Sequence, residues 1–160
     1  MSAKLGRGIN YTRWTEEQEF ELGARAYHSD GVFEYCQAQG ALDAYEGVKV
    51  DVDFQAIPLT STVSGTEPTA VGAPQADATD NYYGWIFRGM GGGDGRGIKM
   101  LITDSISHGA KLTTTATPGV LGSGGDTIQN VVSVDTTAGS GGPHATEVFA
   151  MGLMTTNCQD

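Results

Sequence analysis

The sequence predicts an all-β domain, an antiparallel barrel or a sandwich, with an extended N-terminal arm. Three observations predict this class. Short runs rich in Val, Ile, Thr and aromatic residues recur between clusters of Gly, Pro, Asp and Asn. The 160 residues include 24 glycines, which suit frequent tight turns better than long helices. The run 48–56 alternates apolar and polar residues, as a strand with one buried face does. Repeated strands at this spacing are typical of a barrel or a sandwich.

Residues 1–19 form the predicted arm. Its first fifteen residues carry basic groups with no acid among them, glycines that interrupt any helix, and interleaved apolar side chains. Solvated termini rarely carry such apolar groups, so we expect the arm to bind another surface rather than to trail freely. The expected contacts are Lys4, Arg7, Tyr11, Arg13 and Trp14. Deletion of residues 1–15 is then expected to leave the domain folded.

Residues 20–160 are predicted to form a single β domain. It begins with a short apolar segment, a turn at Ser29-Asp30-Gly31, a strand, a turn of small residues, and a second strand. In the run 48–56, the predicted buried face is Val48, Val50, Val52, Phe54 and Ala56. The opposite face carries Lys49, Asp51, Asp53 and Gln55, and is expected to be solvated.

The rest of the chain alternates between loops and strands. Residues 57–81 contain three prolines and many Thr, Ser and Ala residues, and are predicted to be a long excursion on the surface. Further strands are predicted at 82–88, 98–103, 110–117, 127–135 and 146–154. In the first of these, Tyr83, Trp85 and Phe87 share one face. That face is expected to lie in the core, with an interface between molecules as the alternative.

The sequence contains no recognisable catalytic or metal-binding constellation. The loop 89–97 is rich in glycine but lacks both G-x-G-x-x-G and the G-K-[ST] end of a P-loop, so we expect a surface loop. Neither a second His nor a Cys stands at metal-ligand spacing from His28, His108 or His144. We expect Cys36 to be a buried free thiol and Cys158 an exposed one. These observations predict a non-enzymatic protein with no catalytic residues, no metal and no cofactor.

Charge and hydropathy restrict the partners. A formal net charge of −10 argues against nucleic acid, because phosphate binding needs clustered Lys and Arg. No run of 18 apolar residues is present, so no membrane span is expected. The N-terminal segment lacks the apolar region of a secretory signal, which predicts synthesis in the cytoplasm of the host cell.

Several segments resemble, in order, those of head decoration (capsid cement) proteins of tailed bacteriophages. The first contains Leu22-Gly23, Asp30-Gly31, Phe33-Glu-Tyr35 and Gly40-Ala-Leu42. The second runs from Ala70-Val-Gly72-Ala-Pro74 to Tyr83-Gly84-Trp85-Ile86-Phe87-Arg88-Gly89. A third, Gly109-Ala110-Lys-Leu112-Thr-Thr-Thr-Ala116-Thr-Pro-Gly119, is similar to a strand and turn of that family. Together they cover roughly half of the chain.

The resemblance implies a barrel or β-tulip-like domain that assembles as homotrimers at three-fold positions on the outer capsid of a virion. Its partners would be the major capsid protein and copies of itself. The family is not defined by catalytic positions, so no site residues carry over. Tyr83, Trp85 and Phe87 remain a possible interface.

Two other classes are weighed against a decoration protein. A glycan-binding or tail-fibre module could stack an exposed aromatic residue on a sugar, but the repetitive stalk usual in fibres is missing. A small trimeric nucleotide hydrolase would have a comparable length and glycine-rich motifs. This chain lacks that enzyme's C-terminal phosphate motif, because Ala138-Gly-Ser-Gly-Gly142 has no Arg or Lys nearby.

Overall fold

The computed structural model describes residues 8–60, 70–92, 98–103, 105–123, 127–134 and 142–155. These residues form twelve β-strands, all within one hydrogen-bonded network, and no helix. The prediction of an all-β, barrel-like domain is confirmed. No helix in the described part of the chain is long and apolar enough to cross a membrane.

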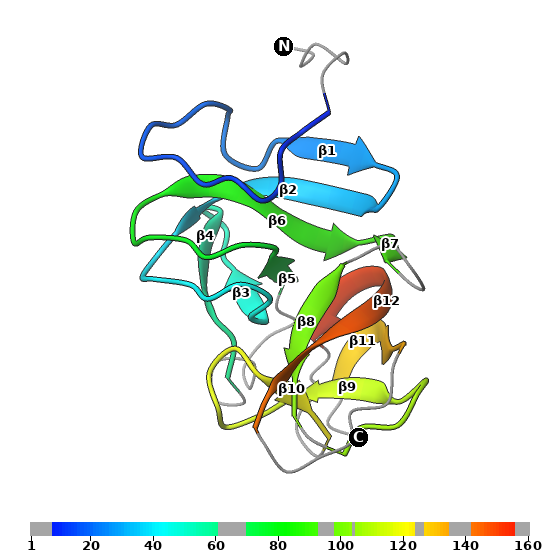
Figure 1. Cartoon of the computed structure of the whole chain (residues 1–160). Helices are drawn as coiled ribbons and strands as arrows, with labels where there is room; N and C mark the ends of the chain where they lie inside the picture. Colours follow the sequence, from blue (N-terminus) through cyan, green and yellow to red (C-terminus); the bar gives the residue numbers. More distant parts are fainter. Residues whose placement is uncertain are drawn as a thin grey trace.

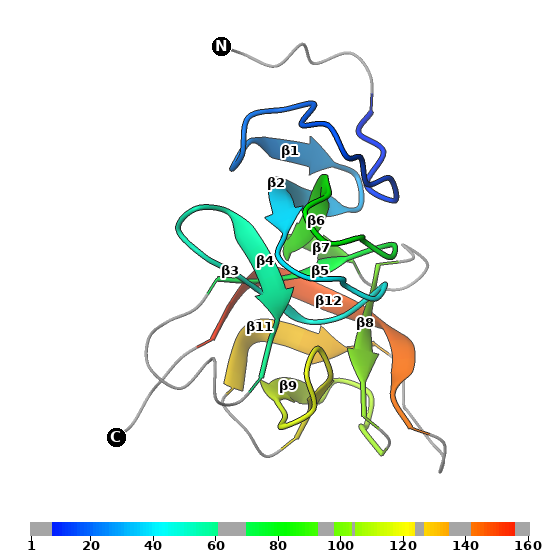
Figure 2. The same cartoon turned by 90° about the vertical axis from the view of Figure 1, so that its left-hand side faces the viewer.

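Two closed five-stranded barrels make up the molecule (Figures 1 and 2). In the first barrel the strands follow each other around the ring in the order β2 (Gly31–Ala38), β4 (Gln55–Pro58), β3 (Val48–Val50), β5 (Ala70–Pro74) and β6 (Tyr83–Gly89). The ring closes because β6 pairs with β2. All neighbours are antiparallel except β2 and β4, which are parallel.

The second barrel uses the C-terminal half of the chain. Its ring order is β12 (His144–Thr155), β11 (Thr127–Ser133), β9 (Lys111–Thr114), β10 (Leu121–Gly122) and β8 (Lys99–Ile102), and β8 pairs with β12. The long strand β12 also reaches the first barrel, where Met154 pairs with Ala70 of β5. The short strand β7 (Gly91–Gly92), which follows β6, pairs with β12 as well. The two barrels are therefore parts of one continuous sheet.

Two clusters of buried side chains fill the molecule. The inner cluster belongs to the first barrel and comprises Cys36, Ala38, Leu42, Val48, Val50, Ala56, Ala78 and Ile86. The shared cluster draws on both barrels and comprises Phe33, Tyr35, Leu59, Val71, Ala73, Trp85, Phe87, Ile98, Met100, Ile102, Ile106, Leu112, Leu121 and Val148. Adjacent strands of the first barrel are crowded at Gly72, where an added Cβ would lie 2.3 Å from Cγ2 of Ile86. Glycine at this position lets β5 lie close to β6.

The first hairpin of the chain has the predicted turn. β1 (Arg25–His28) pairs antiparallel with β2, with Ser29 and Asp30 at the turn between them. Residues 31–36 of β2 are all buried, so this strand has no solvated face. The strands predicted at 82–88, 98–103, 110–117, 127–135 and 146–154 correspond to β6, β8, β9, β11 and β12.

The prediction of one strand over 48–56 is wrong. The run forms a hairpin instead, with β3 and β4 on either side of a turn at 51–54. Asp51 makes the turn, because its Oδ1 accepts hydrogen bonds from the backbone N–H groups of Asp53 (3.0 Å) and Gln55 (2.8 Å). Val52 lies at the tip and is 90% exposed, while Phe54 has a positive φ of 60°. Local side-chain hydrogen bonding thus overrides the alternating pattern.

The prediction of a surface excursion over 57–81 is also wrong in part. Residues 61–69 lie outside the described residues, but β5 is a buried strand between β3 and β6. Val71 and Ala73 have no exposed surface, and Leu59 is only 1% exposed. Small side chains and proline suggest a loop, yet small residues are what the crowded barrel wall requires at this position.

Candidate functional site: the arm and the aromatic face of the first barrel

An aromatic face is formed by Phe33, Tyr35, Tyr83, Trp85 and Phe87, which alternate along β2 and β6. Strand register places Phe33 opposite Phe87 and Tyr35 opposite Trp85. The rings of Tyr35 and Trp85 meet edge to face, with centroids 5.1 Å apart. Such pairs add to the energy of burial. The period-2 pattern of β6 predicted that Tyr83, Trp85 and Phe87 share a face, and the structure adds Phe33 and Tyr35 of β2 to it.

The chain's own N-terminal segment covers this face. The Tyr11 ring stacks on Phe33 with centroids 4.5 Å apart. The Phe20 ring, just after the arm, lies 5.2 Å from the ring of Tyr35 and 5.2 Å from that of Trp85. As a result Phe33 and Trp85 are only 0% and 5% exposed.

The arm also adds a short strand pairing. Thr15 and Tyr83 form an isolated antiparallel bridge, in which each backbone N–H donates to the carbonyl of the other residue at 2.9 and 2.8 Å. Next to it, the Trp14 ring packs against the inner cluster. A Cβ on Gly84 would lie 2.5 Å from that ring, so glycine there makes room for the indole. The described part of the arm is therefore docked on its own domain.

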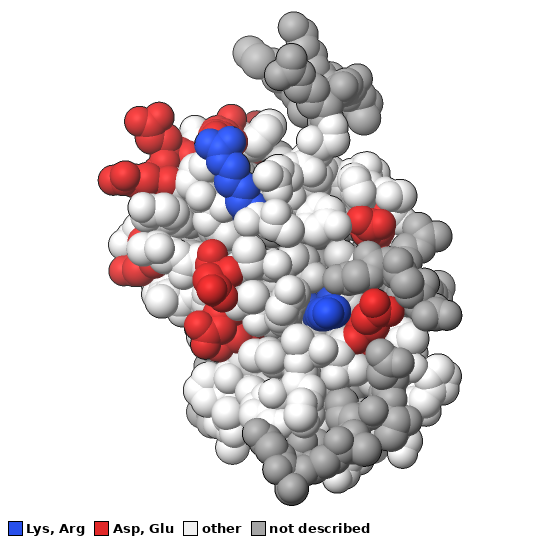
Figure 3. Space-filling view, viewed as in Figure 1, with Lys and Arg blue, Asp and Glu red and all other residues white. Residues whose placement is uncertain are grey.

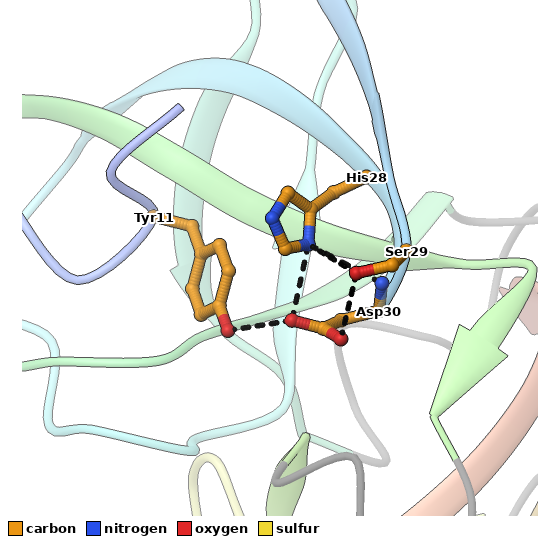
Figure 4. A network of polar contacts seen from close by, with 4 residues as sticks. All are labelled: Tyr11, His28, Ser29 and Asp30. Atoms are coloured by element: carbon orange, nitrogen blue, oxygen red, sulfur yellow. Dashed lines mark hydrogen bonds and ion pairs between the residues drawn. The ribbon is translucent and has the colours of Figure 1, made fainter. Parts of the chain in front are cut away.

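A polar network joins the arm to the first hairpin (Figure 4). The Tyr11 hydroxyl donates to Oδ2 of Asp30 at 2.9 Å. The same carboxylate oxygen lies 3.0 Å from Nδ1 of His28, and Ser29 Oγ donates to the other carboxylate oxygen at 3.3 Å. Burial, followed by the bond to Asp30, raises the pKa of Tyr11 above its usual value. The network holds the arm at the turn between β1 and β2.

This network does not have the geometry of a catalytic triad. Ser29 Oγ approaches Nδ1 of His28 at 3.4 Å, and Asp30 contacts the same nitrogen. A triad needs the nucleophile and the carboxylate on different ring nitrogens, so that a proton can pass through the ring. The backbone N–H of Asp30 also points at Nδ1, at 3.3 Å. The arrangement stabilises a turn rather than activating a nucleophile.

A buried ion network lies across β1, β2 and β6. Glu34, which is 3% exposed, contacts Arg25 Nε at 3.1 Å and Arg88 Nε at 3.3 Å. Burial lowers the pKa of Arg88, and the charge of Glu34 opposes that shift. The Nη1 atom of Arg88 is buried and has no hydrogen-bond partner among the described residues. One carboxylate therefore ties three strands together from inside the sheet.

The thiol of Cys36 lies close to this network. Burial raises the pKa of Cys36 far above its usual value, and the negative charge of Glu34 adds to the shift. A thiol with a raised pKa is a poor nucleophile and a poor metal ligand. The prediction of a buried free thiol is confirmed for Cys36. Cys158 lies outside the described residues.

Acidic side chains gather on the side of the molecule that carries the end of the arm and the segment leading into β1 (Figure 3). Glu16, Glu17, Glu19 and Glu21 are all exposed. Arg13 forms an ion pair with Glu19 at 3.2 Å, and both side chains are largely solvent-exposed. This pair contributes little to stability, because exposed ion pairs are strongly screened. The surface favours a basic or neutral partner over an acidic one.

The predicted contact residues fall into three groups. Tyr11 and Trp14 pack on the chain's own first barrel, and Arg13 is exposed. Lys4 and Arg7 lie outside the described residues.

Of the predicted interface residues, Trp85 and Phe87 are buried by the chain itself and Tyr83 is half-buried. A contact with another molecule would thus use the exposed groups around the arm.

Metal-ligating side chains do not come together in the described residues, where no group of three or more His, Cys, Asp or Glu could hold an ion. His28 belongs to the network at the first turn, His108 hydrogen-bonds the carbonyl of Val134, and His144 opens β12.

Sequence reasoning missed the network of Glu34 with its two arginines. The available signal was Glu34 itself, which is the one charged residue within the sequence of β2.

No family model matches this chain, and no curated protein or solved structure matches it significantly.

Proposed function

We propose that this chain is a structural, non-enzymatic protein that binds the outer surface of an icosahedral phage capsid and stabilises it, as homotrimers at three-fold positions. The observation that carries the proposal is the placement of the resembling segments. Phe33-Glu-Tyr35, Ala70–Pro74 and Tyr83–Gly89 are separated in sequence, yet they lie on β2, β5 and β6. In the first barrel β6 pairs with both β2 and β5.

This placement supports the proposal because matching segments that pair in space describe one structural unit. Chance similarity of separate short segments would not require them to be adjacent strands. The third resembling segment contributes β9, a strand of the second barrel. The resemblance therefore includes strands of both barrels, whereas the arm resembles no segment of that family.

The structure changes which part of the arm is proposed to touch the capsid. Tyr11 and Trp14 hold the arm on the first barrel, so removal of residues 1–15 would uncover Phe33 and the inner cluster. That deletion would destabilise the domain, contrary to the expectation from sequence. Deletion of residues 1–7 removes Lys4 and Arg7 and keeps these contacts. The shorter deletion is the one that separates binding from folding.

Co-sedimentation with expanded, empty capsids of the encoding phage tests the proposal. We expect the full chain to sediment with the capsids at a fixed ratio to the major capsid protein. The 1–7 deletion should bind more weakly with an unchanged unfolding midpoint. Val52→Lys, which alters an exposed hairpin tip, serves as the matched control and should bind normally.

A full chain that stays in the supernatant, and that purified virions lack, would contradict the proposal. Retention on a glycan array without affinity for capsids would favour the glycan-binding alternative. Hydrolysis of nucleotides by the purified chain, lost on substitution of an Asp, would favour the hydrolase.

A further inference from the structure

β1 is the outermost strand of the continuous sheet. It pairs with β2 along one edge, and no described residue pairs with its other edge (Figure 1). An edge strand with unpaired backbone groups is a template for another strand. The first hairpin therefore presents a hydrogen-bonding edge that this chain leaves open within its described part.

The register shows which backbone groups point outward. The backbone N–H of Tyr35 donates to the carbonyl of Ala24 at 2.9 Å, so these two residues occupy a hydrogen-bonded position. The next pair along the strands is Arg25 with Glu34. In an antiparallel pair, hydrogen-bonded and non-hydrogen-bonded positions alternate. The N–H and C=O groups of Arg25 and Tyr27 therefore point away from β2. These two residues supply two donors and two acceptors at the open edge.

Two large side chains at this edge are exposed to solvent. Tyr27 is 74% exposed, and the side chain of Arg25 is 61% exposed although its Nε contacts Glu34. Both side chains lie on the same face of β1, because they are two residues apart. The open edge thus carries a large aromatic ring next to a guanidinium group.

We propose that this edge pairs with the same edge of a second copy of the chain, antiparallel about a two-fold axis. In that register Arg25 of one copy lies opposite Tyr27 of the other, twice, and Ala26 lies opposite Ala26. All four outward donors and acceptors of each copy are then used. Each guanidinium lies beside the other copy's Tyr27 ring, an attractive cation–π arrangement.

Neighbouring registers are less favourable. Arg25 opposite Arg25 brings like charges together, and it leaves Tyr27 without a cross-strand partner. Tyr27 opposite Tyr27 leaves both arginines outside the paired region. The self-complementary order of Arg25 and Tyr27 selects a second copy over an unrelated strand, because the same patch serves both sides of a two-fold contact. This two-fold contact is separate from the proposed trimers, which would form on the capsid at its three-fold positions, and it does not depend on them.

Sedimentation velocity over a range of protein concentrations tests the pairing. We expect the wild type to shift from monomer to dimer as concentration rises, since a four-residue edge makes a small contact. Tyr27→Pro should weaken this association by roughly tenfold or more, because proline blocks strand pairing from its own edge. The N–H of Tyr27 points away from β2, so the hairpin should keep its internal bonds.

Tyr27→Lys is a second variant, which removes the aromatic ring without changing the backbone and should also weaken the association. Val52→Lys is the control for removal of an exposed apolar residue.

A cross-link tests the register itself. Ala26 faces Ala26 at a non-hydrogen-bonded position, where Cα atoms are about 4.5 Å apart. That spacing lies within the range that a disulfide spans. Ala26→Cys in a Cys158→Ser background should therefore form a disulfide dimer on mild oxidation, and Val52→Cys in the same background should not.

Three outcomes would overturn the pairing. They are a wild type that stays monomeric at every concentration, association that Tyr27→Pro and Tyr27→Lys leave unchanged, and equal cross-linking of Ala26→Cys and Val52→Cys.

Discussion

Glu34 is the residue on which the polar interior of the first barrel depends. Its carboxylate is almost fully buried and contacts Arg25 on one neighbouring strand and Arg88 on the other. Removing one member of a buried ion pair is costly because the remaining charge stays desolvated. Arg88 is the member that would be left buried, whereas Arg25 reaches solvent.

Glu34→Gln should lower the free energy of unfolding by about 3 kcal/mol, because Arg88 loses its counter-charge in the interior. Arg25→Ala should cost at most about 1 kcal/mol, since that side chain is largely exposed. Urea unfolding followed by circular dichroism measures both. Equal losses in the two variants would show that Glu34 is not a buried ion-pair partner.

Cys36 gives the folded protein a distinct dependence on pH. In the unfolded chain its thiol ionises above about pH 8.5. In the folded chain burial raises the pKa of Cys36 well beyond that, so the thiol stays protonated. The unfolded state then binds fewer protons than the folded state, and the free energy of unfolding falls as the pH rises from 8.5.

In a Cys158→Ser background, the unfolding free energy should decrease by up to about 1.4 kcal/mol for each pH unit above 8.5. Cys36→Ala should be less stable at pH 7 but should lose this slope. Urea titrations at several pH values between 8 and 9 measure the difference, because tyrosine, whose usual pKa is about 10, ionises mostly above this window. The same slope in both variants would rule out Cys36 as its source.

At the scale of elements, the turn at 51–54 shows how a short polar motif divides a long alternating run. Asp51 accepts two backbone hydrogen bonds and reverses the chain. Val50 remains in the inner cluster, while Val52 is moved to the tip. Two valines with equivalent positions in the alternation therefore have opposite environments.

Val50→Ala should cost about 2 kcal/mol, because a buried valine side chain is truncated. Val52→Ala should change the unfolding free energy by less than about 0.5 kcal/mol, as surface substitutions usually do. Chemical denaturation of the two variants side by side provides the measurement. A comparable loss for both would favour the single strand that the alternation predicts.

At the scale of the whole molecule, the two barrels share one core. The shared cluster takes Phe33, Val71 and Trp85 from the first barrel and Met100, Leu112 and Val148 from the second. Strand β12 adds backbone pairing with β5 of the first barrel. A core and a strand in common predict one cooperative unfolding transition rather than two.

Leu112→Ala should test this coupling, because Leu112 lies in the second barrel and is fully buried. A loss of about 3 kcal/mol is expected from the deleted side chain and the cavity. Tryptophan fluorescence reports the region around the first barrel, where both tryptophans lie. We expect its midpoint to shift as much as that from circular dichroism. A fluorescence midpoint that stays in place while the circular dichroism midpoint moves would indicate independent barrels.

Much of this architecture follows from local patterns. The alternation in 82–88 places Tyr83, Trp85 and Phe87 on one face, and the Ser29-Asp30-Gly31 turn predicts the first hairpin. The burial of both faces of β2 could not be predicted, because it depends on the arm and the inner cluster. The barrel strand at Ala70–Pro74 could not be predicted either, because its small residues fit the space between β3 and β6, which only the fold creates.

By itself, the sequence determined the all-β class, most of the strands and the aromatic face, because these depend on period-2 patterns and turn residues close together in the chain. Only the tertiary structure decided that ten of the strands close into two barrels, that Glu34 joins three strands, and that Tyr11 and Trp14 dock on their own domain. Those features depend on which distant segments pair, and that choice is made by packing and by the pairing of buried polar groups.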